Sequence, residues 1–193
     1  MQHADPVLFA YVRTVLSIIV GLSVGRLLTG LARFIQHPKQ HKVFFPHFAW
    51  VFFLLFYIIN FWWWEFRLQF VNWTFTVYFF TAVYAGLLFL LCTLCFPDSM
   101  YEYTGFADYF MSRRGWFFGI LIAVFLLDII DGRIKGTGYL SSLGPFLWPR
   151  FAFYVAGSAA AITTSNARFH VAFAVAALVV EVVWAFVQYY TPV

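Results

Sequence analysis

The feature that most constrains the fold is the stretch from residue 68 to residue 96, which contains no charged side chain. A helix that crosses a lipid bilayer needs about 20 mostly apolar residues, and this stretch is longer than that. Only helices and closed β-barrels can satisfy all their backbone hydrogen bonds in lipid. A barrel strand would alternate between polar and apolar residues, which this stretch does not do. The sequence therefore predicts a membrane-spanning helix at 68–96.

The composition indicates that lipid, rather than water, surrounds most of the chain. Hydrophobic residues make up 63% of the 193 positions and charged residues only 10%, whereas soluble domains carry about 25% charged residues. The length suits one compact unit, so residues 1–193 are predicted to form a single transmembrane domain. The formal net charge of +4 is too small to indicate a nucleic-acid partner.

Five further apolar stretches extend the prediction to an all-α polytopic membrane protein, a bundle of about six transmembrane helices. The expected helices cover residues 7–35, 43–66, 68–96, 115–131, 149–165 and 168–190. Between the third and fourth helices, residues 97–114 offer aromatic side chains for one apolar face, which predicts a short helix at the membrane interface. Residues 132–144 are rich in Gly and Ser and predict an irregular loop.

The positions of Lys and Arg near the helix ends predict the orientation in the membrane, because cytoplasmic loops carry an excess of these residues. One side of the six-helix arrangement would hold Arg33, Lys39, Lys42, Arg113, Arg114 and Arg168. The other side would hold Arg67, Arg133, Lys135 and Arg150. The bias predicts that both chain termini lie outside the cytoplasm. The aromatic cluster at 61–64 would then lie at the outer interface, where Trp rings are enriched.

The first predicted helix carries a small residue at every fourth position, at Ser17, Gly21, Gly25 and Thr29. Such a stripe lets two membrane helices approach closely, because no large side chain holds their backbones apart. The second helix could belong to the same chain or to another copy in a homo-oligomer. Packing within the chain is the preferred interpretation.

Arg26 lies inside the same helix, where a charge is expensive to bury in lipid. One interpretation is an inner charge that pairs with a neighbouring helix or reaches toward the interface with its long side chain. The other is a place on an ion or proton path.

Four charged residues are predicted to form one polar cluster within the membrane: Arg13, Asp128, Asp131 and Glu181. Asp128 and Glu181 would each lie about 20 Å along their helices from one side of the membrane, at about 1.5 Å per residue. Arg13 would reach the same layer from the opposite side. Because charges inside a membrane usually pair, the cluster could be an ion-pair network that fixes the helix register. It could also be a proton or ion path.

The two cysteines, Cys92 and Cys95, form a C-x-x-C pattern inside a predicted helix. No second cysteine pair exists with which a membrane thiol oxidase could work. We interpret both as small apolar residues, because cysteine is a common buried residue.

The histidines offer only weak signals for metal or haem. His37 and His41 have the spacing that can hold a metal on a helix, but Pro38 between them makes a regular helix unfavourable. His47 and His170 have the chemistry of haem ligands, although a lone histidine in a turn is far commoner. No catalytic residue and no metal site is predicted, and the cofactor is left open.

Five short motifs resemble those of a family of small bacterial integral membrane proteins of unknown function. They are Gly21-Leu22, Leu27-Leu28-Thr29-Gly30-Leu31-Ala32-Arg33, Pro46-His47 with Trp50, Phe61-Trp62-Trp63, and Asp108-Tyr109-Phe110. The resemblance covers roughly the first two thirds of the chain. It implies a multi-pass protein of the bacterial inner membrane and transfers no catalytic residue.

Six-helix potassium channels of the lysosomal type begin with an Arg…Phe-Ser-Asp motif. Arg13 is present here, but no Phe-Ser-Asp follows it, so the sequence does not indicate that family.

Two functions from different classes follow from these patterns. The first is a small oligomeric channel or transporter in which the charged cluster and Arg26 line a polar path. The second is a non-catalytic subunit or scaffold of a larger membrane complex. The aromatic content of 24% favours large packed contacts with partner subunits, lipids or pigments, which supports the second. A membrane enzyme is less favoured, because no strong catalytic motif is present.

Overall fold

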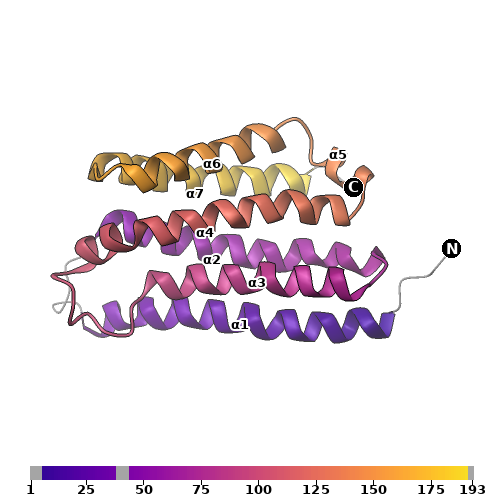
Figure 1. Ribbon diagram of the computed structural model, residues 1–193, viewed down its shortest axis with the longest axis horizontal. Coiled ribbons are helices and arrows are strands. Elements are labelled where there is room, and N and C mark those ends of the chain that lie inside the picture. The colour runs from indigo at the N-terminus through magenta and orange to yellow at the C-terminus, as the bar shows by residue number, and fades with distance from the viewer. Residues whose placement is uncertain (1–5, 38–43, 191–193) are drawn as a thin grey trace.

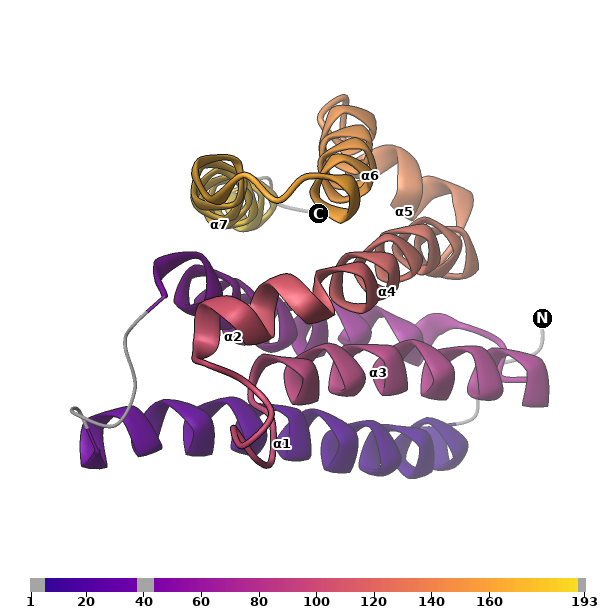
Figure 2. The same cartoon turned by 60° about the vertical axis from the view of Figure 1, so that its left-hand side comes forward.

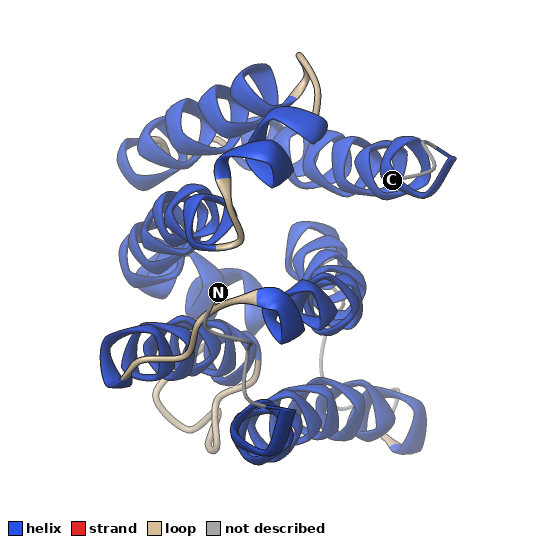
Figure 3. Ribbon diagram, turned by 90° about the vertical axis from the view of Figure 1, so that its right-hand side faces the viewer, coloured by secondary structure: helices blue, strands red, loops and turns tan. Residues whose placement is uncertain are grey.

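The computed structural model describes residues 6–37 and 44–190, and Lys39, His41 and Lys42 lie outside these ranges. The described residues are helical and contain no strand, which confirms the predicted all-α class (Figure 3). The elements are α1 (Pro6–Gln36), α2 (Phe45–Trp64), the short 3-10 helix η1 (Glu65–Phe70), α3 (Phe75–Cys95), α4 (Phe106–Ile134), α5 (Thr137–Ser142), α6 (Leu147–Thr163) and α7 (Ala167–Tyr190).

Among the described residues, four helices are long and apolar enough to cross a membrane. They comprise Val7–Gln36, Phe45–Phe70, Phe75–Cys95 and Ala167–Gln188. The second of these joins α2 and η1. The structure therefore supports a membrane-embedded helical protein, while α4 and α6 are not among the four helices that meet this criterion.

The six long helices run side by side and alternate in direction (Figure 1). α4 packs mainly against α6, α1 against α3, and α2 against α7, whereas α6 and α7 share few contacts. Seen from the side, α6 and α7 form one outer layer and α1 lies at the opposite face, with α2, α3 and α4 between them (Figure 2). The first turn of α1, the last turn of α7 and α5 lie at the same end of the bundle (Figure 1).

The connection between α3 and α4 differs from its prediction. The short interfacial helix expected within 97–114 does not form a separate element, because residues from Phe106 onward belong to α4. The side chain of Asp108 accepts a hydrogen bond from the backbone N–H of Thr104 at 3.0 Å, which ties the incoming chain to the first turn of α4. An acidic residue in a first turn also complements the positive end of the helix dipole.

The loop expected at 132–144 is also more regular than predicted. α4 continues to Ile134, and α5 follows after a single sharp turn at Gly136. Gly136 has φ +114°, a backbone conformation that glycine adopts at no steric cost. The turn folds α5 back toward the end of α4, so that residues 132–144 close that end of the bundle.

Aromatic side chains fill the interior of the bundle at the end that carries the α3–α4 and α6–α7 connections. The Trp50 ring lies within 5.3–5.4 Å of the ring centroids of Phe117, Phe118 and Phe173. All four side chains are buried. We call the part of the bundle that these four rings fill the aromatic half. The rings join α2, α4 and α7 without charged side chains.

The small-residue stripe of α1 does not pack within the chain. Ser17, Gly21, Gly25 and Thr29 are all exposed. A Cβ atom added at Gly21 or Gly25 would meet no other atom within 4 Å. The glycine of α1 that does make a close contact is Gly30, where an added Cβ would clash with the ring of Phe96.

Candidate functional site

A buried arginine near the start of α6 is the centre of the largest polar network. The guanidinium of Arg150 binds both carboxylate oxygens of Glu181 on α7, with Nε–Oε2 and Nη2–Oε1 distances of 3.1 and 2.9 Å. Both residues are buried, at 4% and 0% exposure. A two-point contact of this kind is among the stronger hydrogen-bonded arrangements in proteins and fixes the orientation of both side chains.

Asp128 on α4 is the second carboxylate of this network. Its Oδ2 accepts from Arg150 Nη1 at 3.0 Å, and its Oδ1 accepts from the hydroxyl of Tyr84 at 3.3 Å. The Tyr84 hydroxyl in turn lies 3.0 Å from that of Tyr57. We call Asp128, Arg150 and Glu181 the Arg150 cluster; with the two tyrosines it connects α2, α3, α4, α6 and α7.

Aromatic rings surround the guanidinium of Arg150. Its central carbon lies 5.0 Å from the ring centroids of both Phe125 and Trp184. The hydroxyl of Tyr154, one turn further along α6, donates to Glu181 Oε2 at 3.0 Å. The rings attract the cation and exclude water, so the ion pairs lie in a medium of low polarity, where a missing partner would be costly.

A second charged cluster lies closer to the end of the bundle. Lys135 Nζ lies 2.8 Å from Glu65 Oε1 and 2.5 Å from Asp131 Oδ2. All three side chains are nearly inaccessible, at 2–6% exposure. We call Glu65, Asp131 and Lys135 the Lys135 cluster. The ring of Tyr139 on α5 lies 5.8 Å from Lys135 Nζ, and burial raises the pKa of Tyr139 to about 12, so its phenol stays neutral.

Two carboxylate oxygens of the Lys135 cluster are buried without a hydrogen-bond partner in the described part of the chain: Glu65 Oε2 and Asp131 Oδ1. Buried polar atoms are normally satisfied, so two orphaned oxygens in one cluster need an explanation. A proton on one carboxyl group, or a bound cation, would supply the missing interaction.

The charges of the two clusters do not balance. Each cluster places two carboxylates against one cation, so the formal charge is −1 in each. Asp128 and Asp131 belong to different clusters but are three residues apart on α4, a spacing that makes them neighbours on one helix face. An uncompensated charge in a water-excluded interior is strongly unfavourable, which favours uptake of positive charge at this face.

The structure brings together only part of the predicted charged set. Asp128 and Glu181 share Arg150, whereas Asp131 lies in the Lys135 cluster. Arg13 is exposed and lies against the ring of Trp62, with its guanidinium carbon 5.8 Å from the ring centroid. The cation that meets the acids is therefore Arg150 rather than Arg13.

Sequence reasoning missed Glu65, Lys135 and Arg150 because each lies near a predicted helix end, where a charge usually faces water. The spacing of Asp131 and Lys135 held the one usable signal. An acid and a base four residues apart pair when the helix continues through both, and α4 does so up to Lys135 at its C-cap.

Arg26 has a local structural role. Its Nη2 donates to the carboxylate of Asp98 at 2.5 Å and to the backbone oxygen of Phe96 at 2.7 Å. These two acceptors follow the C-terminus of α3, where backbone oxygens lack helical partners. Arg26 therefore lies at the end of the bundle that carries the α3–α4 connection, away from both charged clusters.

The described histidines and cysteines form no group of three or more His, Cys, Asp or Glu side chains that could hold a metal ion. His47 Nε2 lies 2.5 Å from the backbone oxygen of Cys95, and His170 Nε2 lies 3.1 Å from that of Thr164. Each histidine thus satisfies a carbonyl at or near a helix end. Cys92 and Cys95 are free and buried.

No protein-family model, curated protein or solved structure matches the sequence, so the resemblance to small bacterial membrane proteins stays a prediction and the function must be inferred from the geometry above.

Proposed function

We propose that this protein is a small multi-pass membrane transporter or channel whose buried carboxylates take up protons or a small cation. The observation that carries the proposal is the count of charges: four carboxylates, three of them buried and Asp128 partly buried, against two buried cations in two adjacent clusters. Ionisable groups inside a membrane are costly and commonly mark ion pathways or proton relays.

The location of the clusters favours a site reached from one side. The Lys135 cluster and the Arg150 cluster both lie toward the end of the bundle that carries α5, and the aromatic half fills the interior toward the other end. An open pore would need polar side chains along its whole length. A transporter that rearranges between two states therefore fits this arrangement better than a permanently open channel.

The proposed membrane placement has six spans. α4 and α6 run alongside the four apolar helices (Figure 1) and are included among the spans. The membrane is proposed to be a bacterial inner membrane, with both termini outside the cytoplasm. A fluorescent reporter fused to the C-terminus should stay dark if it folds only in the cytoplasm, and bright fluorescence would reverse the orientation.

Flux measured in proteoliposomes tests the transport proposal. The parent protein should carry protons or a monovalent cation, and Glu181→Gln should abolish that flux while the protein stays folded. Glu102→Gln, at an exposed position before α4, is the matched control and should transport normally. Unchanged flux in a folded Glu181→Gln variant would remove Glu181 from any conduction mechanism.

Infrared difference spectroscopy separates a bound proton from a bound cation. If the Lys135 cluster holds a proton, the parent protein at neutral pH should show the carbonyl band of a protonated carboxylic acid. Glu65→Gln or Asp131→Asn should remove that band, and Glu102→Gln should leave it. A parent spectrum without the band, together with stabilisation by a monovalent cation, would identify the cation as the bound species.

A second candidate function, a subunit or scaffold of a larger membrane complex, is favoured by the exposed stripe on α1. Ser17, Gly21, Gly25 and Thr29 leave a surface free of large side chains that another helix could approach closely. Native mass spectrometry of gently extracted protein distinguishes the cases. A defined homo-oligomer supports the transporter proposal, and a stoichiometric complex with unrelated subunits supports the scaffold.

A further inference from the structure

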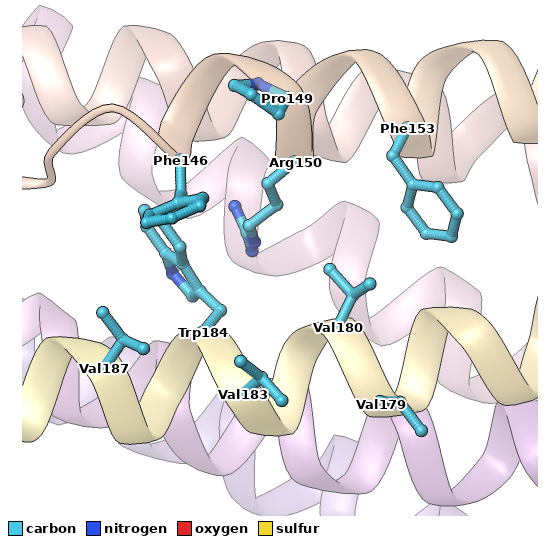
Figure 4. Close-up of a pocket in the computed structure, with 9 residues that line it drawn as sticks. All are labelled: Phe146, Pro149, Arg150, Phe153, Val179, Val180, Val183, Trp184 and Val187. Atoms are coloured by element: carbon cyan, nitrogen blue, oxygen red, sulfur yellow. The ribbon is translucent and has the colours of Figure 1, made fainter.

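A cavity of about 380 Å³ opens between α6 and α7, beside the Arg150 cluster. Its walls are apolar: Phe146 immediately precedes α6, Phe153 lies on α6, and Val180, Val183 and Trp184 lie on α7 (Figure 4). Arg150 is the charged residue among its lining residues. The cavity exists because α6 packs mainly on α4 and α7 mainly on α2, which leaves the two helices with few contacts to each other.

The cavity opens sideways, toward the surroundings of the bundle. Phe146 and Val183 line it and are 65% and 55% exposed. In the proposed membrane placement these side chains face lipid. A molecule that enters the cavity would therefore come from the bilayer, and its body would be apolar.

The hydrogen-bonding groups at the inner wall restrict the polar part of such a molecule. A guanidinium has five N–H groups, and Arg150 uses three of them on Glu181 and Asp128. Both oxygens of each carboxylate already accept a hydrogen bond, from Arg150, Tyr84 or Tyr154. Arg150 lines the cavity and the two carboxylates do not, so the polar group that the cavity offers is a hydrogen-bond donor.

The charge of the cluster restricts the ligand further. Two carboxylates against one guanidinium leave an excess negative charge, which repels an anionic head group. A cationic head group in the cavity would meet the guanidinium of Arg150, which lines the cavity, whereas the two carboxylates do not line it. The complementary group is a neutral hydrogen-bond acceptor, such as an ester or ketone carbonyl.

We propose that the cavity between α6 and α7 binds a neutral lipid-like molecule whose carbonyl oxygen accepts a hydrogen bond from Arg150. The volume lies within the range of about 300–1,000 Å³ that is usual for small-molecule sites. The proposal rests on the membrane placement given under the proposed function, but it does not require that the protein transports anything.

Binding is tested with three probes that share one apolar body: methyl decanoate, decanoate and decane. Native mass spectrometry of the detergent-solubilised full chain counts bound molecules and gives Kd for each probe. Methyl decanoate should bind as a single adduct, about tenfold or more tighter than decane, the gain that one net hydrogen bond supplies. Decanoate should bind more weakly than its methyl ester.

Two variants place the site. Val183→Trp fills the cavity and should abolish binding of methyl decanoate. Val175→Trp is the control, because Val175 is an exposed valine of the same helix that does not line the cavity. A parallel melting curve shows whether each variant is folded.

Three results would overturn the proposal. Equal binding of methyl decanoate and decane would exclude the hydrogen bond to Arg150. Tighter binding of decanoate would show that the site prefers an anion. Loss of binding in a folded Val175→Trp variant, or its retention in Val183→Trp, would place the probe elsewhere. Because no flux is measured, failure here leaves the transport proposal standing, and failure of transport leaves this site standing.

Discussion

The two halves of the bundle join their helices through different kinds of contact. In the aromatic half, Trp50, Phe117, Phe118 and Phe173 join α2, α4 and α7 through ring contacts. In the other half, Arg150 joins α4, α6 and α7 through ion pairs. Each ring contact contributes little free energy, and the stabilisation is spread over many neighbouring contacts. In a buried ion pair a single side chain has a large effect on stability, because removing one partner leaves the other unpaired in a medium of low polarity.

This difference predicts which substitutions the molecule tolerates in each half. The aromatic half should lose stability in proportion to the volume removed or added. The charged half should respond to the sign of the charge removed, because its carboxylates outnumber its cations. The following predictions test that contrast, beginning with the largest expected effect.

Arg150→Met should be the most damaging of these substitutions. It removes the cation between Asp128 and Glu181 and leaves the buried carboxylate of Glu181 and the partly buried carboxylate of Asp128 with no opposite charge. We expect a loss of about 3–5 kcal/mol in the free energy of unfolding, measured by thermal or chemical unfolding in detergent. A loss smaller than that caused by Glu181→Gln would contradict the excess of carboxylates over cations in this cluster.

Gly30→Ala should cost about 1–3 kcal/mol, because its Cβ would enter the space that the Phe96 ring occupies. Gly21→Ala is the matched control in the same helix. It meets no atom within 4 Å and should leave the melting temperature of the monomer unchanged or slightly raised. Equal losses in the two variants would show that the exposed stripe of α1 is buried in an oligomer.

Glu181→Gln should cost less than Arg150→Met, about 1–2 kcal/mol. The variant weakens the contacts with Arg150 but leaves a neutral Arg150–Asp128 pair instead of an excess negative charge. The double variant Arg150→Met/Glu181→Gln should be more stable than Arg150→Met alone, because one unpaired carboxylate is removed. Additive losses in this cycle would show that Arg150 and Glu181 do not interact.

Arg13→Gln should have the smallest effect, at most about 1 kcal/mol. Arg13 is exposed and its described contact is the face of Trp62, an interaction worth about 0.5–1 kcal/mol at exposed sites. The melting temperature of Arg13→Gln, measured beside that of Arg150→Met, decides which arginine belongs to the acidic cluster. A larger shift for Arg13→Gln would restore the arrangement expected from the sequence.

The sequence identified most of the acidic residues of the charged clusters but did not predict which cations pair with them. Asp128, Asp131 and Glu181 stood out because acids are rare in apolar helices. Their cations did not, since Arg150 and Lys135 lie beside Pro149 and Gly136, where a sequence reading places charges in water. The short interfacial helix failed for a related reason: a pattern of aromatic residues does not reveal whether a helix stops at Arg114 or continues.

What the sequence determined by itself was the class of structure: a chain this apolar, with stretches of this length, must form helices that satisfy their own backbone in lipid. What only the tertiary structure decided was which side of each helix faces which neighbour. The exposed stripe on α1 and the choice of Arg150 over Arg13 both depend on contacts between segments far apart in the chain. Helical periodicity is a local property, whereas pairing between helices depends on how all of them pack at once.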